Sequence, residues 1–168
     1  MCANEVAPAL SVGNKYLIEC FRDGKLLWAE EVHNTVVDEG LNDVLNKYLK
    51  GSSYTAAFYV GLKGAGTIAA GDTMASHAGW TEVTGYSEGA RPALTLGTVA
   101  AKSVDNSASK AVFTANGSST VAGAFVTTNS TKGGSTGTLY GAADFSGSRS
   151  LISGDVLNVT VTCTSASA

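Results

Sequence analysis

The stretch NKYLIECFRDGKLLWAEEVH, residues 14–33, decides the fold class. Two alternating apolar runs flank Asp23 and Gly24, a dipeptide that favours the type I′ turn of a two-residue β-hairpin. In the first run, every second residue from Tyr16 to Cys20 is apolar, so these side chains share one face. The stretch therefore predicts two antiparallel strands with one face directed at a core.

Further strand-like runs follow from residue 56 onward, separated by turns rich in Gly, Asn and Ser. In the last run, DVLNVTVTCTS at 155–165, apolar and polar residues alternate as in a half-buried antiparallel strand. Residues 129–137, NSTKGGSTG, have the composition of a flexible linker. Many short strands in one chain predict a mainly β protein, an antiparallel β-sandwich of the immunoglobulin-like or jelly-roll-like kind.

The period changes after the hairpin, where TVVDEGLNDVLNKYLKG predicts one amphipathic α-helix, at about 35–50, packed on the sandwich. Thr35 and Asp38 resemble an N-capping box, and Gly51 is placed to end the helix. Gly40 inside the helix indicates a close neighbour. The apolar residues form one stripe that we expect to cover the core: Val37, Leu41, Val44, Leu45 and Tyr48.

The length of 168 residues fits one domain. Residues 1–13 lack a clear period and are expected to form an extended N-terminal arm, followed by a single β-sandwich domain over 14–168. Only 15% of the residues are charged, the net charge is −3 and the basic residues are scattered, which argues against nucleic-acid binding. We expect neither a membrane span nor a secretory signal, so synthesis in a cytoplasm is predicted. The three cysteines have no CxxC spacing, which disfavours zinc and disulfides.

The stretch GDTMASHAGWTEV, residues 71–83, is the one place that resembles an active site. Asp72, Ser76, His77 and Glu82 supply an acid, a hydroxyl, an imidazole and a second acid at short range. Adjacent Ser and His rarely point at each other productively, and no GxSxG turn supports a nucleophile. The second histidine of the chain lies on a different element, which disfavours a metal site. We therefore predict no enzymatic activity and no cofactor.

A structural interpretation of the same stretch is an ordered crossover between strands. The Asp72 carboxylate is expected to accept backbone N–H groups two residues ahead, and His77 to bond a backbone carbonyl. Trp80 is expected to bury its ring while its N–H finds a partner. Arg91-Pro92 predicts an extended start to the next strand.

Several segments together resemble small virion proteins of tailed bacteriophages. The similarity rests on NTVVDEGLNDVLNKYL, FYVGL and AAGDTMASHAGWTEVTGYSEGARPAL within residues 34–96, and on the closing SGDVLNVTVTCTS. It implies a non-enzymatic accessory protein of the head-decoration or minor-tail type, made in the host cytoplasm and located on the particle surface. The positions that match the characteristic loop, and that it implies hold the fold together, are Asp72, His77, Trp80, Glu82, Tyr86, Arg91 and Pro92.

The first functional hypothesis is a head decoration, or cement, protein that binds the assembled major capsid protein as a homo-oligomer on a symmetric lattice. The alternative is a minor tail, tail-tip or fibre-associated subunit. A third hypothesis is a carbohydrate-binding attachment module, which would present exposed aromatic residues such as Tyr54 and Tyr140 on one flat face. In any of these, Val6, Pro8 and Leu10 of the arm could contact a partner by adding a strand or filling a groove.

Overall fold

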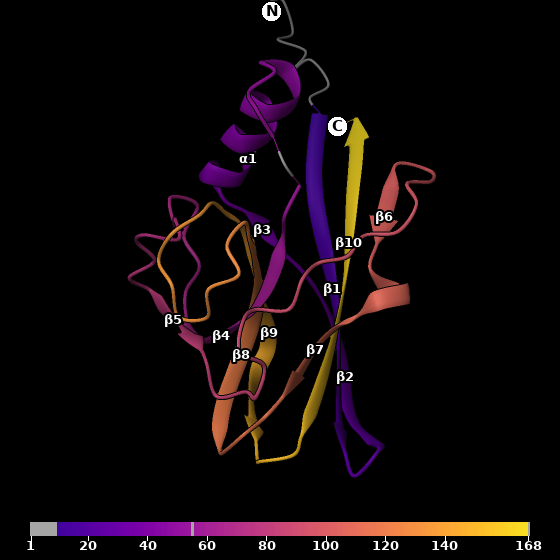
Figure 1. Cartoon of the computed structure of the whole chain (residues 1–168), viewed down its shortest axis with the longest axis vertical. Coiled ribbons are helices and arrows are strands. Elements are labelled where there is room, and N and C mark those ends of the chain that lie inside the picture. The colour runs from indigo at the N-terminus through magenta and orange to yellow at the C-terminus, as the bar shows by residue number, and fades with distance from the viewer. Residues whose placement is uncertain (1–9, 55, 168) are drawn as a thin grey trace, which may run out of the picture.

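The computed structural model describes residues 10–54 and 56–167, which form two facing antiparallel β-sheets and one short helix (Figure 1). One sheet has the order β2-β1-β10-β6, with β7 also paired to β10; the other has the order β3-β9-β8-β4-β5. The strands of the first sheet are β1 (Leu10–Arg22), β2 (Lys25–His33), β6 (Ser103–Asp105), β7 (Ala111–Thr114) and β10 (Val156–Ser167). Those of the second are β3 (Thr35–Val36), β4 (Tyr59–Gly66), β5 (Trp80–Val83), β8 (Ser119–Thr127) and β9 (Leu139–Leu151). The predicted mainly β fold, an antiparallel sandwich with one helix, is confirmed.

The β1–β2 hairpin turns where the sequence predicts. Asp23 and Gly24 both have positive φ, at 49° and 73°, as a type I′ turn requires, and Arg22 pairs with Lys25 across them. The register shifts after Cys20. Beyond that β-bulge the hairpin continues to its tip, which lies at the end of the sandwich away from the helix (Figure 1).

The core lies between the two sheets and is built from the alternate positions of their strands. Tyr16, Ile18 and Cys20 of β1 are fully buried, as expected, and β10 buries every second residue from Leu157 to Val161. Cys20 behaves as a small apolar residue, and both Cys20 and Cys163 are free thiols. Cys2 lies outside the described residues.

Strand β1 begins at Leu10, earlier than the expected end of the N-terminal arm at residue 13. The reason is that β10 runs to Ser167 and supplies backbone partners along the whole of β1, with Leu10 opposite Ser167. Val6 and Pro8, the other two positions expected in a partner-contact arm, lie outside the described residues.

The helix is shorter than predicted. Residues 35 and 36 pair with β9 as strand β3, α1 spans Asp38–Val44, and a π-helical turn, η1, spans Leu45–Leu49. The predicted capping box is wrong, because Thr35 is part of a strand and Val37, an apolar residue, occupies the N-cap. Gly51, with φ of 71°, follows the end of η1 as expected.

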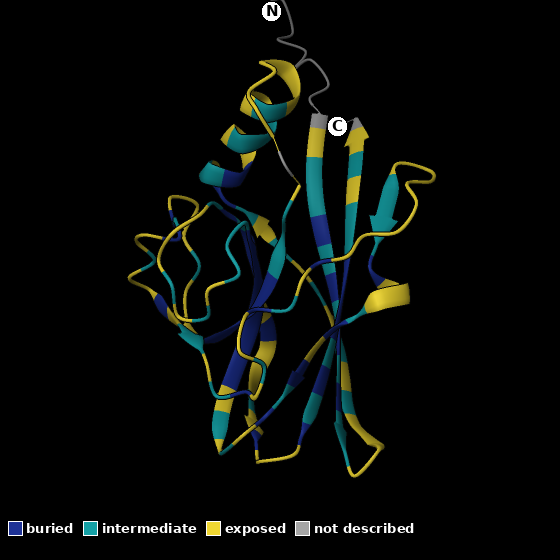
Figure 2. Ribbon diagram, viewed as in Figure 1, coloured by how far each residue is buried: buried dark blue, intermediate teal, exposed yellow. Residues whose placement is uncertain are grey.

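The apolar stripe of the helix is not buried as predicted. Val37 is fully buried and Val44 is partly buried, but the other three stripe residues are exposed: Leu41 at 40%, Leu45 at 53% and Tyr48 at 84%. Leu49, which lies outside the predicted stripe, is 69% exposed. The helix contacts β9 through Gly40, where an added Cβ would overlap the Tyr140 carbonyl oxygen. The π turn follows, in which the Lys50 N–H bonds the Leu45 carbonyl, and the side chains of Leu45, Tyr48 and Leu49 on it are exposed. Figure 2 shows the resulting exposed surface at the end of the sandwich opposite the β1–β2 turn.

Candidate functional site

We define residues 69–92 as the crossover. Asp72 and Trp80 join the two ends of its first part. One Asp72 carboxylate oxygen accepts the Trp80 indole N–H at 2.9 Å and the Ala69 backbone N–H at 3.0 Å. The backbone N–H that Asp72 accepts therefore lies three residues before it, and not two residues ahead as expected. Because both Asp72 and Trp80 are buried, their hydrogen bond satisfies polar groups that would otherwise be costly to remove from water.

His77 is held against Trp80 and not against a serine. Its ring stacks on the indole with centroids 4.0 Å apart, and its Nδ1 lies 3.0 Å from the Trp80 carbonyl oxygen. Since a carbonyl only accepts, Nδ1 carries the proton and donates. The expected bond from His77 to a backbone carbonyl is thus present. The neighbouring Ser76 uses its backbone N–H to bond the Thr73 hydroxyl.

Arg91 and Glu82 form a buried, bidentate ion pair at the other end of the crossover. Arg91 is 2% exposed, and its Nε and Nη2 donate to the two Glu82 carboxylate oxygens at 2.9 and 2.7 Å. Its Nη1 and Nη2 also donate to the carbonyls of Asn129 and Gly134, both at 2.8 Å. The guanidinium is thereby supplied with acceptors on several sides, which is the condition under which burying an ion pair is tolerable.

The same pair organises the segment expected to be a flexible linker. Besides its guanidinium bonds, Arg91 donates its backbone N–H to the Ser130 carbonyl at 2.8 Å, and Glu82 accepts the Gly133 N–H at 2.9 Å. Within the segment, Asn129 bonds the Thr136 hydroxyl at 2.9 Å. The 129–137 loop is therefore tied to the crossover at several points, and its glycines serve turns rather than a free tether.

Tyr86 and Pro92 occupy structural positions as well. The Tyr86 ring packs edge-on against Phe113 with centroids 5.0 Å apart, while the Lys132 ammonium lies 4.3 Å above it and bonds the Tyr86 and Glu88 carbonyls. Burial raises the pKa of the Tyr86 hydroxyl above its usual range. The Pro92 carbonyl accepts the N–H of Val60 at 2.9 Å, which leads the chain in extended form back to β4.

One aromatic residue that the sequence did not single out connects the two halves of the crossover. The Phe125 ring of β8 packs against the Trp80 indole, with centroids 5.3 Å apart, and against the Arg91 guanidinium at the same distance. Phe125 fits there because Gly61 opposes it on β4, where any Cβ would overlap the ring. Asp72, His77, Trp80, Glu82 and Arg91 thus form a single cluster, centred on Phe125, that holds the crossover on the sheet.

Sequence reasoning also missed two buried ionic contacts. The ammonium of Lys63, a fully buried side chain of β4, bonds the Gly66 carbonyl and one Asp144 oxygen, both at 2.6 Å. At the opposite end of the sandwich, Arg22 donates to both oxygens of buried Asp155, at 2.7 and 2.8 Å. Strand alternation places Lys63 on the face of β4 opposite to Leu62. Its side chain is buried because the crossover folds over that face, which the sequence does not reveal.

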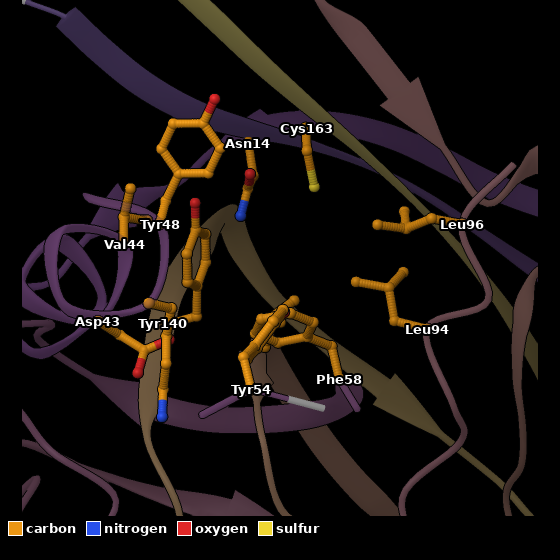
Figure 3. A pocket seen from close by; sticks show the side chains of 12 residues that line it. Asn14, Asp43, Val44, Tyr48, Tyr54, Phe58, Leu94, Leu96, Tyr140 and Cys163 are labelled. Carbon is orange, nitrogen blue, oxygen red and sulfur yellow. The ribbon is translucent and has the colours of Figure 1, made fainter. Parts of the chain in front are cut away.

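A cavity of about 260 Å³ opens beside the helix, at the end of the core (Figure 3). Its lining comes from the helix, from the chain before β4, from β9 and from the first sheet. Tyr54 and Tyr140 both line this cavity, and Tyr140 packs edge-on against Phe58 with centroids 5.8 Å apart. The two tyrosines therefore surround a concave site instead of presenting a flat face.

Within residues 10–54 and 56–167, no group of three or more His, Cys, Asp or Glu side chains is arranged to hold a metal ion. No helix in the described part of the chain is long and apolar enough to cross a membrane. In the crossover cluster, acids, cations and an indole pair with one another inside the fold.

No protein-family model matches the chain, and no curated protein shows significant sequence similarity to it.

Proposed function

We propose that this protein is a structural component of a tailed-bacteriophage virion, a head decoration protein that binds the assembled major capsid protein. The resemblance of the helix, the crossover and the last strand to phage virion proteins supports this role. The structural observation that carries it is the apolar helix face, which we define as Leu41, Leu45, Tyr48 and Leu49. These side chains are 40–84% exposed on one helix at one end of the molecule. Exposed apolar side chains that cluster on one surface are typical of protein-binding sites.

The rest of the molecule suits a rigid attachment unit. The charged groups of the crossover are paired inside the fold, so they hold the sandwich together rather than face a substrate. β1 also begins at the end that carries the apolar helix face (Figure 1). In this proposal, the preceding residues Val6 and Pro8 contribute apolar contacts to the same interface.

The mechanism is mass action. A protein that binds only the assembled lattice stabilises it by RT ln(1 + [L]/Kd), where [L] is its free concentration. Copies related by the lattice symmetry repeat the same contact around each axis, so a modest affinity per copy reinforces every capsomer junction. No chemical step is involved.

The test uses phage particles that lack this protein. We expect them to release DNA at a lower temperature than complete particles, and added purified protein to restore the difference. The variant Leu45→Gln/Tyr48→Gln/Leu49→Gln removes the apolar helix face while keeping good helix formers, and is expected not to rebind. The matched control Leu26→Gln/Leu27→Gln changes exposed leucines at the far hairpin and is expected to rebind normally.

Two results would contradict the decoration role: unchanged DNA release from particles that lack the protein, or rebinding of the helix-face variant with wild-type affinity. The same apolar helix face would also suit a tail, tail-tip or fibre-associated subunit. Electron microscopy with gold-labelled antibody separates the two locations, because a decoration protein labels the head surface and a tail subunit does not.

A further inference from the structure

The cavity beside the helix contains a buried amide whose hydrogen bonds are not satisfied. Asn14 of β1 is 3% exposed and lines the cavity. Neither its side-chain nitrogen nor its oxygen makes a hydrogen bond of normal geometry among the described residues, although the Tyr16 hydroxyl lies close to the amide. In Figure 3 its amide points into the space bounded by Tyr140 and Leu94. An unpaired buried amide costs about 1–3 kcal/mol, so the site favours any occupant that restores its hydrogen bonds.

The backbone fixes Asn14 in this orientation. Its N–H donates to the Asn34 side-chain oxygen at 2.8 Å, and its carbonyl accepts the Asn34 N–H at 3.0 Å. Asn14 is also opposite Cys163 in the β1–β10 register. The amide is therefore held at the cavity wall by two neighbouring segments, as a preorganised binding group is.

The walls around this amide are apolar apart from one acid and one base on the helix. Phe58, Leu94 and Val126 supply hydrocarbon surface. Burial raises the pKa of the Tyr140 hydroxyl to about 12 and that of the Cys163 thiol to about 11, so both are neutral at physiological pH. The charged side chains that line the site, Asp43 and Lys47, come from the helix, where Lys47 bonds the Ser53 carbonyl. An ionised occupant would lose hydration without gaining a counter-charge in the interior.

The volume sets the size of the occupant. An apolar protein cavity of about 150 Å³ binds benzene, so a cavity of about 260 Å³ accommodates roughly ten non-hydrogen atoms. Tyr48 and Tyr54, which are largely exposed, stand at the mouth and can close over an apolar ring.

We propose that this cavity binds a compact, uncharged aromatic or alicyclic molecule of about ten non-hydrogen atoms that carries one hydroxyl or amide group, which pairs with Asn14. Such a group both donates and accepts, and so can satisfy the Asn14 oxygen or nitrogen. This ligand site goes beyond the virion role and does not depend on it, since it concerns the isolated chain in solution.

Three fluorescent probes that share one naphthalene ring test the chemistry: 1-naphthol, naphthalene and the anion 1-naphthoate. In fluorescence titrations of the purified protein we expect 1-naphthol to bind about tenfold more tightly than naphthalene, because of its hydrogen bond. The anion is expected not to bind measurably. Equal affinities for 1-naphthol and naphthalene, or preferred binding of 1-naphthoate, would overturn the proposal.

Variants locate the binding. Asn14→Leu is expected to abolish the preference for 1-naphthol while naphthalene still binds, and Leu94→Trp to fill the cavity and block both probes. Val112→Trp, on the exposed side of β7, gains the same ring elsewhere and is expected to bind like the wild type. Retained 1-naphthol binding by a folded Leu94→Trp protein would place the probe elsewhere and refute the assignment.

A measurement on the unmodified protein covers the case in which a variant does not fold. Cys163 lines the cavity and is partly exposed. Its alkylation by N-ethylmaleimide, followed by peptide mass spectrometry, is expected to slow at least severalfold when 1-naphthol is present and not when 1-naphthoate is present. An unchanged alkylation rate at saturating 1-naphthol would contradict binding at this site.

Discussion

The crossover and the helix invert the usual distribution of polar and apolar residues. In the crossover, the side chains of Asp72, Glu82 and Arg91 are buried. On the apolar helix face, Leu45 and Tyr48 are exposed. The difference shows that a side chain of this molecule is buried where the fold supplies it with a partner. Arg91 has a carboxylate and two carbonyls within 3 Å. The helix, in contrast, meets β9 near its start, through Gly40 and through the Glu39 carboxylate, which accepts the Leu139 N–H at 2.6 Å.

The inversion also separates two tasks. Polar groups that bond one another fix the geometry of the loops, because hydrogen bonds are directional. Apolar groups left at the surface are available to a second molecule, because their burial is the main driving force of association. Each of the following changes tests one side of this contrast.

The largest loss of stability is expected from Arg91→Met. Met fills part of the space but leaves the buried Glu82 carboxylate and the Asn129 and Gly134 carbonyls without their donor. Breaking a buried pair in this way costs about 3–5 kcal/mol in the free energy of unfolding, measured by urea denaturation. The matched control Lys15→Met breaks the exposed Lys15–Glu31 pair and is expected to cost less than about 1 kcal/mol. Equal losses in the two variants would refute the internal role of the crossover.

Gly40→Ala tests the close contact between the helix and the Tyr140 carbonyl of β9. The new methyl group overlaps the Tyr140 carbonyl, so the helix must shift away from β9, at a cost of about 1–3 kcal/mol in the free energy of unfolding. Gly71→Ala is the control, because an added Cβ there meets nothing within 4 Å. If Gly40→Ala instead stabilised the protein, as helix propensity alone would predict, the close contact would be wrong.

Acid unfolding tests a third buried carboxylate, that of Asp155, which is paired with Arg22 as Glu82 is with Arg91. Hydrogen bonds from Arg22 hold the pKa of Asp155 below its ordinary value of 3.8, against the opposing effect of burial. The folded state therefore binds its proton less readily, and the resulting stability is present above about pH 4 and lost as the pH falls further.

Asp155→Asn is expected to lower the free energy of unfolding by about 1–2 kcal/mol at pH 7. Its stability should then depend less on pH between 4 and 2 than that of the wild type, as followed by thermal melts across that range. Parallel acid profiles for the two proteins would contradict the assigned pairing.

The smallest effect on stability is expected from Leu45→Gln/Tyr48→Gln/Leu49→Gln. Because these side chains are mostly in water already, the free energy of unfolding should change by no more than about 0.5 kcal/mol per substitution. The same urea denaturation gives the value. A loss as large as that of Arg91→Met would mean that the apolar helix face is packed inside the fold, and would remove the basis of the proposed interface.

Features governed by neighbouring residues could be predicted from the sequence. The Asp23-Gly24 turn, the buried face of β1 and the close approach at Gly40 depend on local turn chemistry, on alternation and on a missing side chain. The exposure of the helix stripe could not be predicted, because an apolar period does not reveal that Leu45–Leu49 form a π turn or which side chains the sheet covers.

In the candidate site, too, some contacts could be predicted from neighbouring residues and others depend on the fold. The sequence indicated that the Trp80 N–H would find a partner and that His77 would bond a backbone carbonyl, and both bonds are present. It could not indicate that Phe125 joins Trp80 to Arg91, because that contact follows from the β4–β8 register. The carbonyls of Asn129 and Gly134 were unpredictable for a further reason, since every residue carries such a group and only the fold selects these two.

The pairing of the first strand with the last has a consequence for how the chain folds. β10 lies inside its sheet. It bonds β1 along one of its sides and β6 and β7 along the other, and Leu10 is opposite Ser167. During synthesis the β1–β2 hairpin therefore waits with an open hydrogen-bonding edge until β10 leaves the ribosome. Contacts so distant in sequence make closure of this sheet slow, and a nascent chain stalled before Val156 would expose a strand edge prone to intermolecular pairing.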